Sequence, residues 1–346
     1  TAVVLTGITM GHQVLALIGA GIVMAQAIAG VVAITVQYRR AIAPRLAALA
    51  VHYAVALVLL ATGALLGFLI AWSNAHGRSA LADGFYLAHT TTMLLGFVGT
   101  TVLGTLTVLW PTMLRTPMEP VAPRWTTRGL PYLVGGTALV AACGLWPPLA
   151  GLGTLVYLGG ACAVLVPAYR TARRVPPTSF ATASATASVA WFVGCVAVLG
   201  ARMALADDAA AAREVIHSLR LPLAAGFALQ ILVAALSYLT PVMLGGGPAA
   251  TRATNAIMDR FAAYRVTAAN ACLLLALYPG APWQVRVVAG ALAALVTSYL
   301  LAGMILSLRE VSQRKRPPRT PRTPADADPT SNPAGHRSAQ PRRGTR

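Results

Sequence analysis

Long apolar runs, each broken by a short polar stretch, dominate the chain up to about position 310. A helix needs about 20 apolar residues to cross the roughly 30 Å core of a bilayer. By that measure the pattern predicts nine spans, near 12–36, 46–72, 86–110, 130–147, 149–168, 187–206, 221–244, 262–280 and 284–307. The fourth and fifth share a tight turn at residues 146–148 and are expected to form a hairpin. The prediction is therefore an all-α fold, a polytopic helical membrane bundle of about nine transmembrane helices.

The composition supports a membrane location and explains the charge. Hydrophobic residues make up 57% of the chain and charged residues 10%, whereas charged residues approach a quarter of a soluble domain. The net charge is nevertheless +18. Because basic side chains are expensive inside the hydrocarbon core, they belong in loops and tails. The expected partner is the lipid bilayer, and no nucleic acid is expected.

Alternate loops differ in arginine content. The stretches 37–45, 111–129, 169–186 and 245–265 carry three arginines each, and the opposite loops carry few. The positive-inside rule then places the first set and the C-terminal tail in the cytoplasm, which fits a bacterial cytoplasmic (inner) membrane protein. On this topology the N-terminus falls outside, so we expect the natural protein to begin earlier than Thr1, with a further helix upstream.

The character of the chain changes near residue 310. Residues 1–310 form the predicted transmembrane domain. Residues 311–346 are rich in Pro, Arg, Ser and Thr and have almost no large apolar side chains. Such a segment cannot bury enough surface to offset its ordering entropy, so it is predicted to be a disordered basic tail.

Two spans resemble each other at an offset of 130 residues. Residues 96–114 align without gaps to residues 226–244, and both spans run from outside to inside. This pattern predicts a parallel internal repeat, and the alternative is a shared way of ending a helix before proline. The identical pairs are Gly96/Gly226, Phe97/Phe227, Leu106/Leu236, Leu109/Leu239, Pro111/Pro241, Met113/Met243 and Leu114/Leu244.

Three histidines share one predicted depth. His12, His89 and His217 fall near the outer ends of spans one, three and seven. Neutral imidazole binds haem iron, copper and zinc, so these three are candidate cofactor ligands. Met10 lies close to His12, and Met93 shares a helix face with His89. His89, Met93, His12 and Met10 are therefore candidate metal ligands, and interfacial hydrogen bonding is the alternative for each histidine.

Other polar residues suggest structural roles. Gln26, Gln230 and Asn270 are expected to make hydrogen bonds between helices. Gly63 and Gly67 lie at a spacing that lets helices approach closely. A group of basic residues near span seven is a candidate site for an anion, and it consists of Arg213, His217 and Arg220. The simpler partners of these basic residues are the nearby carboxylates of Asp207, Asp208 and Glu214.

Two stretches resemble a known family. HTTTMLLGFVGTTVLGTLTVLWPTMLRT (89–116) and LPLAAGFALQILVAALSYLTPVMLGGGP (221–248) resemble the membrane region of bacterial copper oxidases or nitrite-reductase-like multicopper oxidases. That region is itself similar to NnrS-type and haem-copper oxidase-like membrane proteins. The resemblance implies haem or copper ligation by outer-side histidines, first His89 and then His12 and His217.

The leading hypothesis is thus a membrane redox protein, a copper oxidase-like oxidoreductase component. It would bind haem or copper near its extracytoplasmic face and support an oxidase or denitrification-type system, with a cupredoxin or another redox protein as partner. The repeat motivates a second hypothesis, a secondary transporter. A cofactor-free membrane anchor or assembly subunit is the third.

Overall fold

Helices form all the regular structure in the part of the chain that is described. The computed structural model describes Thr6, residues 12–40 and residues 44–314, with backbone alone for 44–48. The α-helices are α2 (Gln13–Arg40), α3 (Pro44–Ala75), α4 (Ser79–Thr91), α5 (Thr100–Met113), α6 (Ala122–Ala141), α7 (Pro148–Arg174), α8 (Phe180–Ala204), α9 (Ala209–Leu221), α10 (Gln230–Leu244), α11 (Gly247–Met258), α12 (Ala262–Leu277) and α13 (Trp283–Arg314). Two π-helical segments, η1 (Thr92–Gly99) and η3 (Pro222–Leu229), and a short 3₁₀ turn, η2 (Ala142–Gly144), complete the order.

Each predicted span corresponds to a helix, which confirms the all-α membrane bundle. Seven helices of the described residues are long and apolar enough to cross a membrane: α2, α3, α4–η1–α5, α7, α8, α9–η3–α10 and α13. The α6 helix carries Arg124 and Arg128 near its start. The α12 helix has 16 residues, which give about 24 Å of length, short of the roughly 30 Å core. By length and composition α6 and α12 are therefore weaker candidates for spanning a membrane, and packing against neighbouring helices holds them in the bundle.

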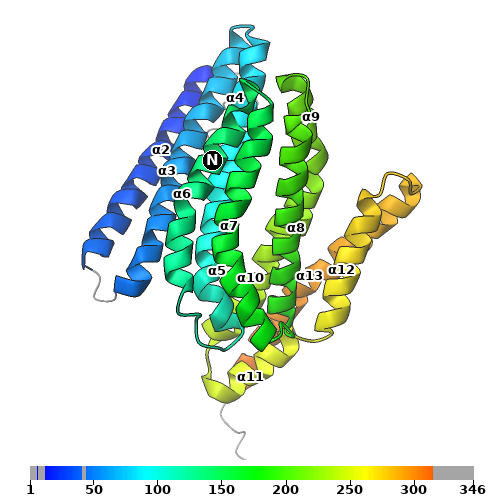
Figure 1. Cartoon of the computed structure of the whole chain (residues 1–346). Coiled ribbons are helices and arrows are strands. Elements are labelled where there is room, and N and C mark those ends of the chain that lie inside the picture. The colour runs from blue at the N-terminus through cyan, green and yellow to red at the C-terminus, as the bar shows by residue number, and fades with distance from the viewer. Residues whose placement is uncertain (1–5, 7–11, 41–43, 315–346) are drawn as a thin grey trace, which may run out of the picture.

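The described parts of the four arginine-rich stretches lie at one end of the bundle (Figure 1). The α5–α6 and α7–α8 connections are there, and α11 runs across that end. We call it the arginine-rich end. The α3–α4, α6–α7 and α8–α9 connections lie at the other end, which we call the opposite end, and the α12–α13 connection points the same way but stops short of it. The predicted tail after Arg314 lies outside the described residues.

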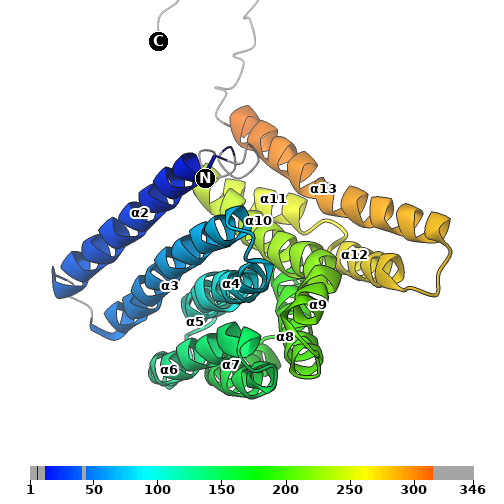
Figure 2. The same cartoon turned by 90° about the horizontal axis from the view of Figure 1, so that it is seen from above.

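Outward-facing apolar side chains mark the lipid-facing surface. The α2 and α13 helices lie at the edges of the bundle when it is viewed along its length (Figure 2). Large hydrophobic residues on their outer faces are exposed, among them Val14, Ile28, Leu295 and Leu301. A protein surrounded by water rarely leaves such continuous apolar faces uncovered, whereas lipid tails cover them without penalty.

The helix boundaries agree with the predicted parallel repeat and extend its 130-residue offset. The α4 and α9 helices, at 79–91 and 209–221, differ by the same 130 residues as η1 and η3 at 92–99 and 222–229. The next helices begin at Thr100 and Gln230, also 130 residues apart. Both long helices run from the opposite end to the arginine-rich end (Figure 1). The 130-residue offset therefore begins well before the aligned residues, in helices whose charged residues lower the hydropathy of their first turns below that of the predicted spans.

An aromatic chain in the core joins the two π-helical segments. The Tyr157 hydroxyl of α7 donates to the Leu95 carbonyl of η1 at 3.0 Å. The Tyr157 ring meets Phe192 of α8 edge-on at 6.3 Å, and Phe192 packs on Phe227 of η3 at 4.5 Å. A side chain at Gly99 would overlap the Tyr157 hydroxyl, so glycine is required there. The two π segments are thus fixed relative to each other through one stack of buried rings.

Glycines bring α6 and α7 into backbone contact. A Cβ atom at Gly136 would lie 2.5 Å from the Tyr157 nitrogen, and one at Gly153 would lie 2.6 Å from the Val140 nitrogen. Small residues at such interfaces let membrane helices associate through close packing. The predicted hairpin is therefore confirmed, and it positions Tyr157 against η1.

Removing the Tyr157 hydroxyl tests this core. We expect Tyr157→Phe to lower the free energy of unfolding by about 1 to 2 kcal/mol, because the buried Leu95 carbonyl then loses the hydroxyl that donates to it. Tyr132→Phe is the control, since the Tyr132 side chain is exposed. Unfolding of both variants in detergent micelles measures the difference, and equal stability of the two would contradict the assignment.

Candidate functional site

His89 is held in one orientation by a backbone carbonyl. It lies in the last turn of α4, and its Nδ1 donates to the Gly63 carbonyl of α3 at 2.7 Å. Because a carbonyl oxygen can only accept, Nδ1 carries the proton and Nε2 of the neutral ring keeps its lone pair. No hydrogen bond to Nε2 is present among the described residues. This is the arrangement in which a histidine binds a metal.

Met93 shares a glycine niche with His89. A Cβ atom at Gly67 would lie 3.2 Å from the Cε1 and Nδ1 atoms of His89, and one at Gly63 would clash with the Met93 sulfur. The small-residue spacing in α3 thus has a specific use, since it makes room for an imidazole and a thioether on neighbouring turns. We call Gly63, Gly67, His89 and Met93 the His89 niche.

The other sequence-predicted ligands lie near the same end without forming one cluster. The His217 ring of α9 meets Tyr86 of α4 edge-on at 5.6 Å, and its Nδ1 lies 3.5 Å from the Glu214 carboxylate. His12 is exposed just before α2, and Met10 lies outside the described residues. In the described ranges no three His, Cys, Asp or Glu side chains form a group that could hold a metal ion.

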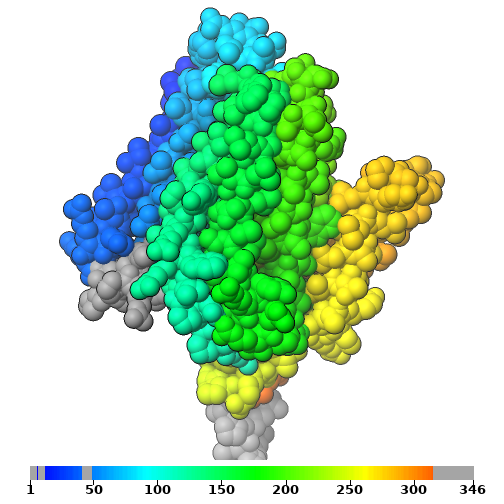
Figure 3. Space-filling view, in the orientation of Figure 1, coloured from blue at the N-terminus to red at the C-terminus, as the bar shows by residue number. Residues whose placement is uncertain are grey.

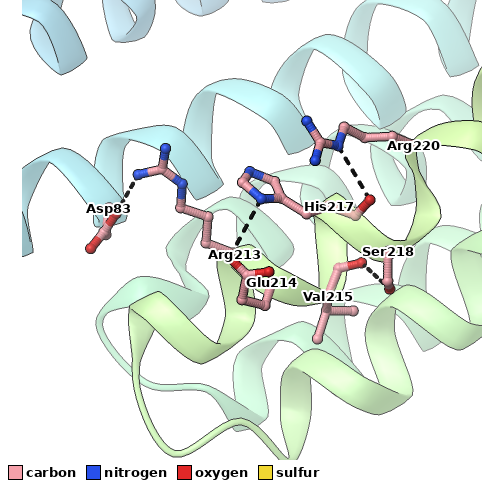
Figure 4. A network of polar contacts seen from close by, with 7 residues as sticks. All are labelled: Asp83, Arg213, Glu214, Val215, His217, Ser218 and Arg220. Atoms are coloured by element: carbon pink, nitrogen blue, oxygen red, sulfur yellow. Dashed lines mark hydrogen bonds and ion pairs between the residues drawn. The ribbon is translucent and has the colours of Figure 1, made fainter.

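An ion pair joins the two repeats at the opposite end (Figure 4). Arg213 of α9 donates to Asp83 of α4 at 2.7 Å, and its guanidinium lies 4.4 Å from the Tyr86 ring centre. Asp83 and Arg213 are 130 residues apart, the offset of the repeat. Two residues at equivalent positions of parallel repeats can touch only close to the axis that relates the repeats. The ion pair therefore agrees with such an axis passing between α4 and α9.

This ion pair changes the expected partners of Arg213. The sequence suggested Asp207, Asp208 or Glu214, but the structure gives Asp83. Asp208 instead caps α9 by accepting from the Ala211 nitrogen. The repeat offset was the signal that could have identified the Asp83 partner, since it places the two residues at matching positions.

A polar cavity opens at the arginine-rich end, where the repeats end. Its volume is about 290 Å³, and we call it the arginine-end cavity. Arg115 and Asp259 line it together with the buried Ser237. The Ser237 hydroxyl has no hydrogen-bond partner among the described residues. Arg115 has a φ of 53°, unusual for a residue with a side chain, and its counterpart Gly245 has a φ of 61°.

Asp259 ties α11 to the start of α8 beside this cavity. Its carboxylate accepts from the Phe180 nitrogen at 2.9 Å. Burial raises the pKa of the Asp259 carboxyl above its ordinary value, while the Phe180 N–H, Arg115 and Arg265 act in the other direction. Arg265 in turn is buried between the rings of Phe180 and Tyr299, at 3.6 and 4.1 Å. These contacts hold the α11–α12 junction against the bundle.

His52 is a buried histidine that the sequence did not single out. It lies on α3 against Gly104 of α5, is fully enclosed, and neither ring nitrogen has a hydrogen-bond partner among the described residues. Buried polar groups are nearly always paired, so the unpaired His52 ring is an exception in the contact between α3 and α5. Nothing in the residue types alone marks it, because its burial depends on how α3 packs.

Comparisons with known proteins give no relatives. No model of a protein family matches the chain, and no curated protein or solved structure matches it either. The copper-oxidase resemblance therefore stays a prediction, and function must be argued from geometry.

A double-mutant cycle on Asp83→Asn and Arg213→Gln tests the link between the repeats. The pair is partly buried, so we expect a coupling free energy of about 1 kcal/mol that falls as salt is raised. The matched control is Glu310–Arg314, an exposed pair within one helix, whose coupling should be about 0.3 to 0.5 kcal/mol. Unfolding in detergent at two salt concentrations measures both cycles, and a coupling no larger than the control would contradict the link.

Proposed function

We propose that this multi-pass membrane protein binds copper or haem through His89 and supports a redox system of the oxidase or denitrification type. The observation that carries the proposal is the His89–Gly63 hydrogen bond, which fixes the tautomer and leaves Nε2 free to coordinate. By the positive-inside rule the arginine-rich end is cytoplasmic, so the His89 niche lies in the extracytoplasmic half of the bilayer. A cupredoxin or another redox protein would then approach from the opposite end.

The donor set of the niche fits copper better than haem. Imidazole nitrogen and thioether sulfur together suit Cu(I), a soft ion. His89 and Met93 stand on one helix and face the same side, so they can share one copper ion. They cannot occupy the two opposite faces of a haem, which would need its second axial ligand from elsewhere. His12 is a further candidate ligand, and His217 is another, because its contact with Glu214 is through Nδ1 and leaves Nε2 available.

The metal and haem content of purified protein tests the proposal. We expect protein from copper- and haem-replete cells to carry stoichiometric copper or a Soret band, and His89→Ala to lose it. His76→Ala is the matched control, because the Nδ1 of His76 also bonds a backbone carbonyl, that of Trp72, in an exposed loop. Elemental analysis and absorption spectra give both readouts. Wild-type protein that is metal-free and colourless, or equal loss in both variants, would contradict it.

Transport is a second candidate, favoured by the interruption of two helices at equivalent positions. In transporters built from repeats, broken helices in corresponding positions line the substrate path. Here η1 and η3 interrupt matching helices, and the arginine-end cavity lies where those helices finish.

Thiol accessibility distinguishes a transporter from a rigid redox protein. In a background that lacks the four native cysteines, Ser237→Cys places a thiol in the arginine-end cavity. Alternating access predicts labelling of this thiol from both sides of a vesicle. Thr178→Cys, at the exposed mouth of the same cavity, is the control and should label from the arginine-rich side alone. Labelling of Ser237→Cys from that side alone would exclude transport.

A further inference from the structure

A second cavity separates the α12–α13 hairpin from the rest of the bundle. It holds about 210 Å³ and lies between η3 and α10 on one side and the hairpin on the other. In the view along the bundle the hairpin stands beside α10 (Figure 2), and its outer turn is separated from α9 in the space-filling view (Figure 3). We call this space the hairpin cavity. It lies within the depth of the membrane-spanning helices, and its walls are almost wholly apolar.

Most polar side chains around the hairpin cavity are already paired. Asn270 accepts from the Trp191 indole at 2.7 Å and donates to the Val266 carbonyl at 2.8 Å. The Thr297 hydroxyl donates within its own helix. The Arg265 guanidinium donates to the Met258 carbonyl at 2.9 Å, and its unpaired Nε has no exposed surface. Apart from the Arg265 Nε atom, these groups have their hydrogen bonds within the protein.

Gln230 differs from these residues because its whole side-chain amide is unpaired. It lines the cavity at the first residue after η3, is 9% exposed, and its side-chain amide has no hydrogen bond among the described residues. The interhelical hydrogen bond expected of Gln230 from sequence is therefore absent, whereas the one expected of Asn270 is present. Water does not supply partners inside a bilayer, so an unpaired amide facing an apolar cavity is unfavourable.

The chemistry of the cavity selects its ligand. An amide is neutral and offers both an N–H donor and a carbonyl acceptor. A cavity of about 150 Å³ holds benzene, so 210 Å³ accommodates a ring. We propose that the hairpin cavity binds the ring of a lipid-soluble quinone. Its carbonyl accepts from the Gln230 amide, the hydroxyl of its reduced form donates to the same amide, and its chain leaves between helices into the lipid. An acyl chain would fill the space but leave the amide unpaired.

The site is separate from the His89 niche and does not depend on it. The two lie beside different π segments, η3 and η1, and on different repeats. A quinone site and a metal site can therefore be tested independently, and His89→Ala is expected to keep its quinone binding.

Two decyl-bearing probes test the inference on delipidated protein in detergent. Decyl-benzoquinone should raise the unfolding temperature saturably and bind about five- to tenfold tighter than decylbenzene, which lacks the carbonyls. In Gln230→Leu this preference should vanish. Gln26→Leu is the matched control, because Gln26 is exposed on the lipid-facing α2, and it should keep the preference.

Each alternative has its own outcome. Equal affinity for both probes in wild type means that the cavity holds an apolar chain, and overturns the proposal. A quinone preference that persists in Gln230→Leu, or no saturable binding at all, also overturns it. Should Gln230→Leu fail to fold, Ala269→Leu fills the same cavity from α12 and should abolish binding of both probes. Loss of quinone binding in His89→Ala would show that the two sites are not independent.

Discussion

The fold depends on how two widened helical turns are held against each other. A π-helical turn shifts the register of everything that precedes it, so its position decides which side chains face which neighbour. The Tyr157 hydroxyl fixes the first such turn at the Leu95 carbonyl, and the Ser188 hydroxyl donates to the Phe227 carbonyl in the second. In a bilayer every backbone carbonyl needs a partner from the protein, so these hydroxyls stabilise the segments as well as position them.

The widened turns rotate the helical segments that precede them and so determine which neighbours the side chains of α4 and α9 face. Upstream of η1 it turns His89 toward the glycines of α3, and upstream of η3 it turns Arg213 toward Asp83. The residue directly after each turn has a polar side chain without a hydrogen bond among the described residues, Thr100 after η1 and Gln230 after η3. The two helices share their backbone pattern but differ in residue type at equivalent positions, so the His89 niche lies beside η1 and the hairpin cavity beside η3.

The apolar runs predicted the helical bundle, its hairpin, the common end of the arginine-rich stretches and the parallel repeat. They did not predict that α4 and α9 begin at Ser79 and Ala209, because Asp83 in the first helix and Arg213 and Glu214 in the second lower the hydropathy there. The π segments were also missed, since no residue type marks a widened turn. Of the site, His89 and Met93 were predicted from spacing. Asp83 was not, because its pairing with Arg213 depends on how two distant helices pack.

A density map of the protein in a lipid nanodisc, at a resolution that separates helical turns, tests the central claim most directly. It should show one widened turn at residues 92–99 and another at 222–229, with the Tyr157 side chain against the first. Unbroken α-helical register through either segment would contradict the account, because Asp83, His89 and Arg213 would then face other neighbours.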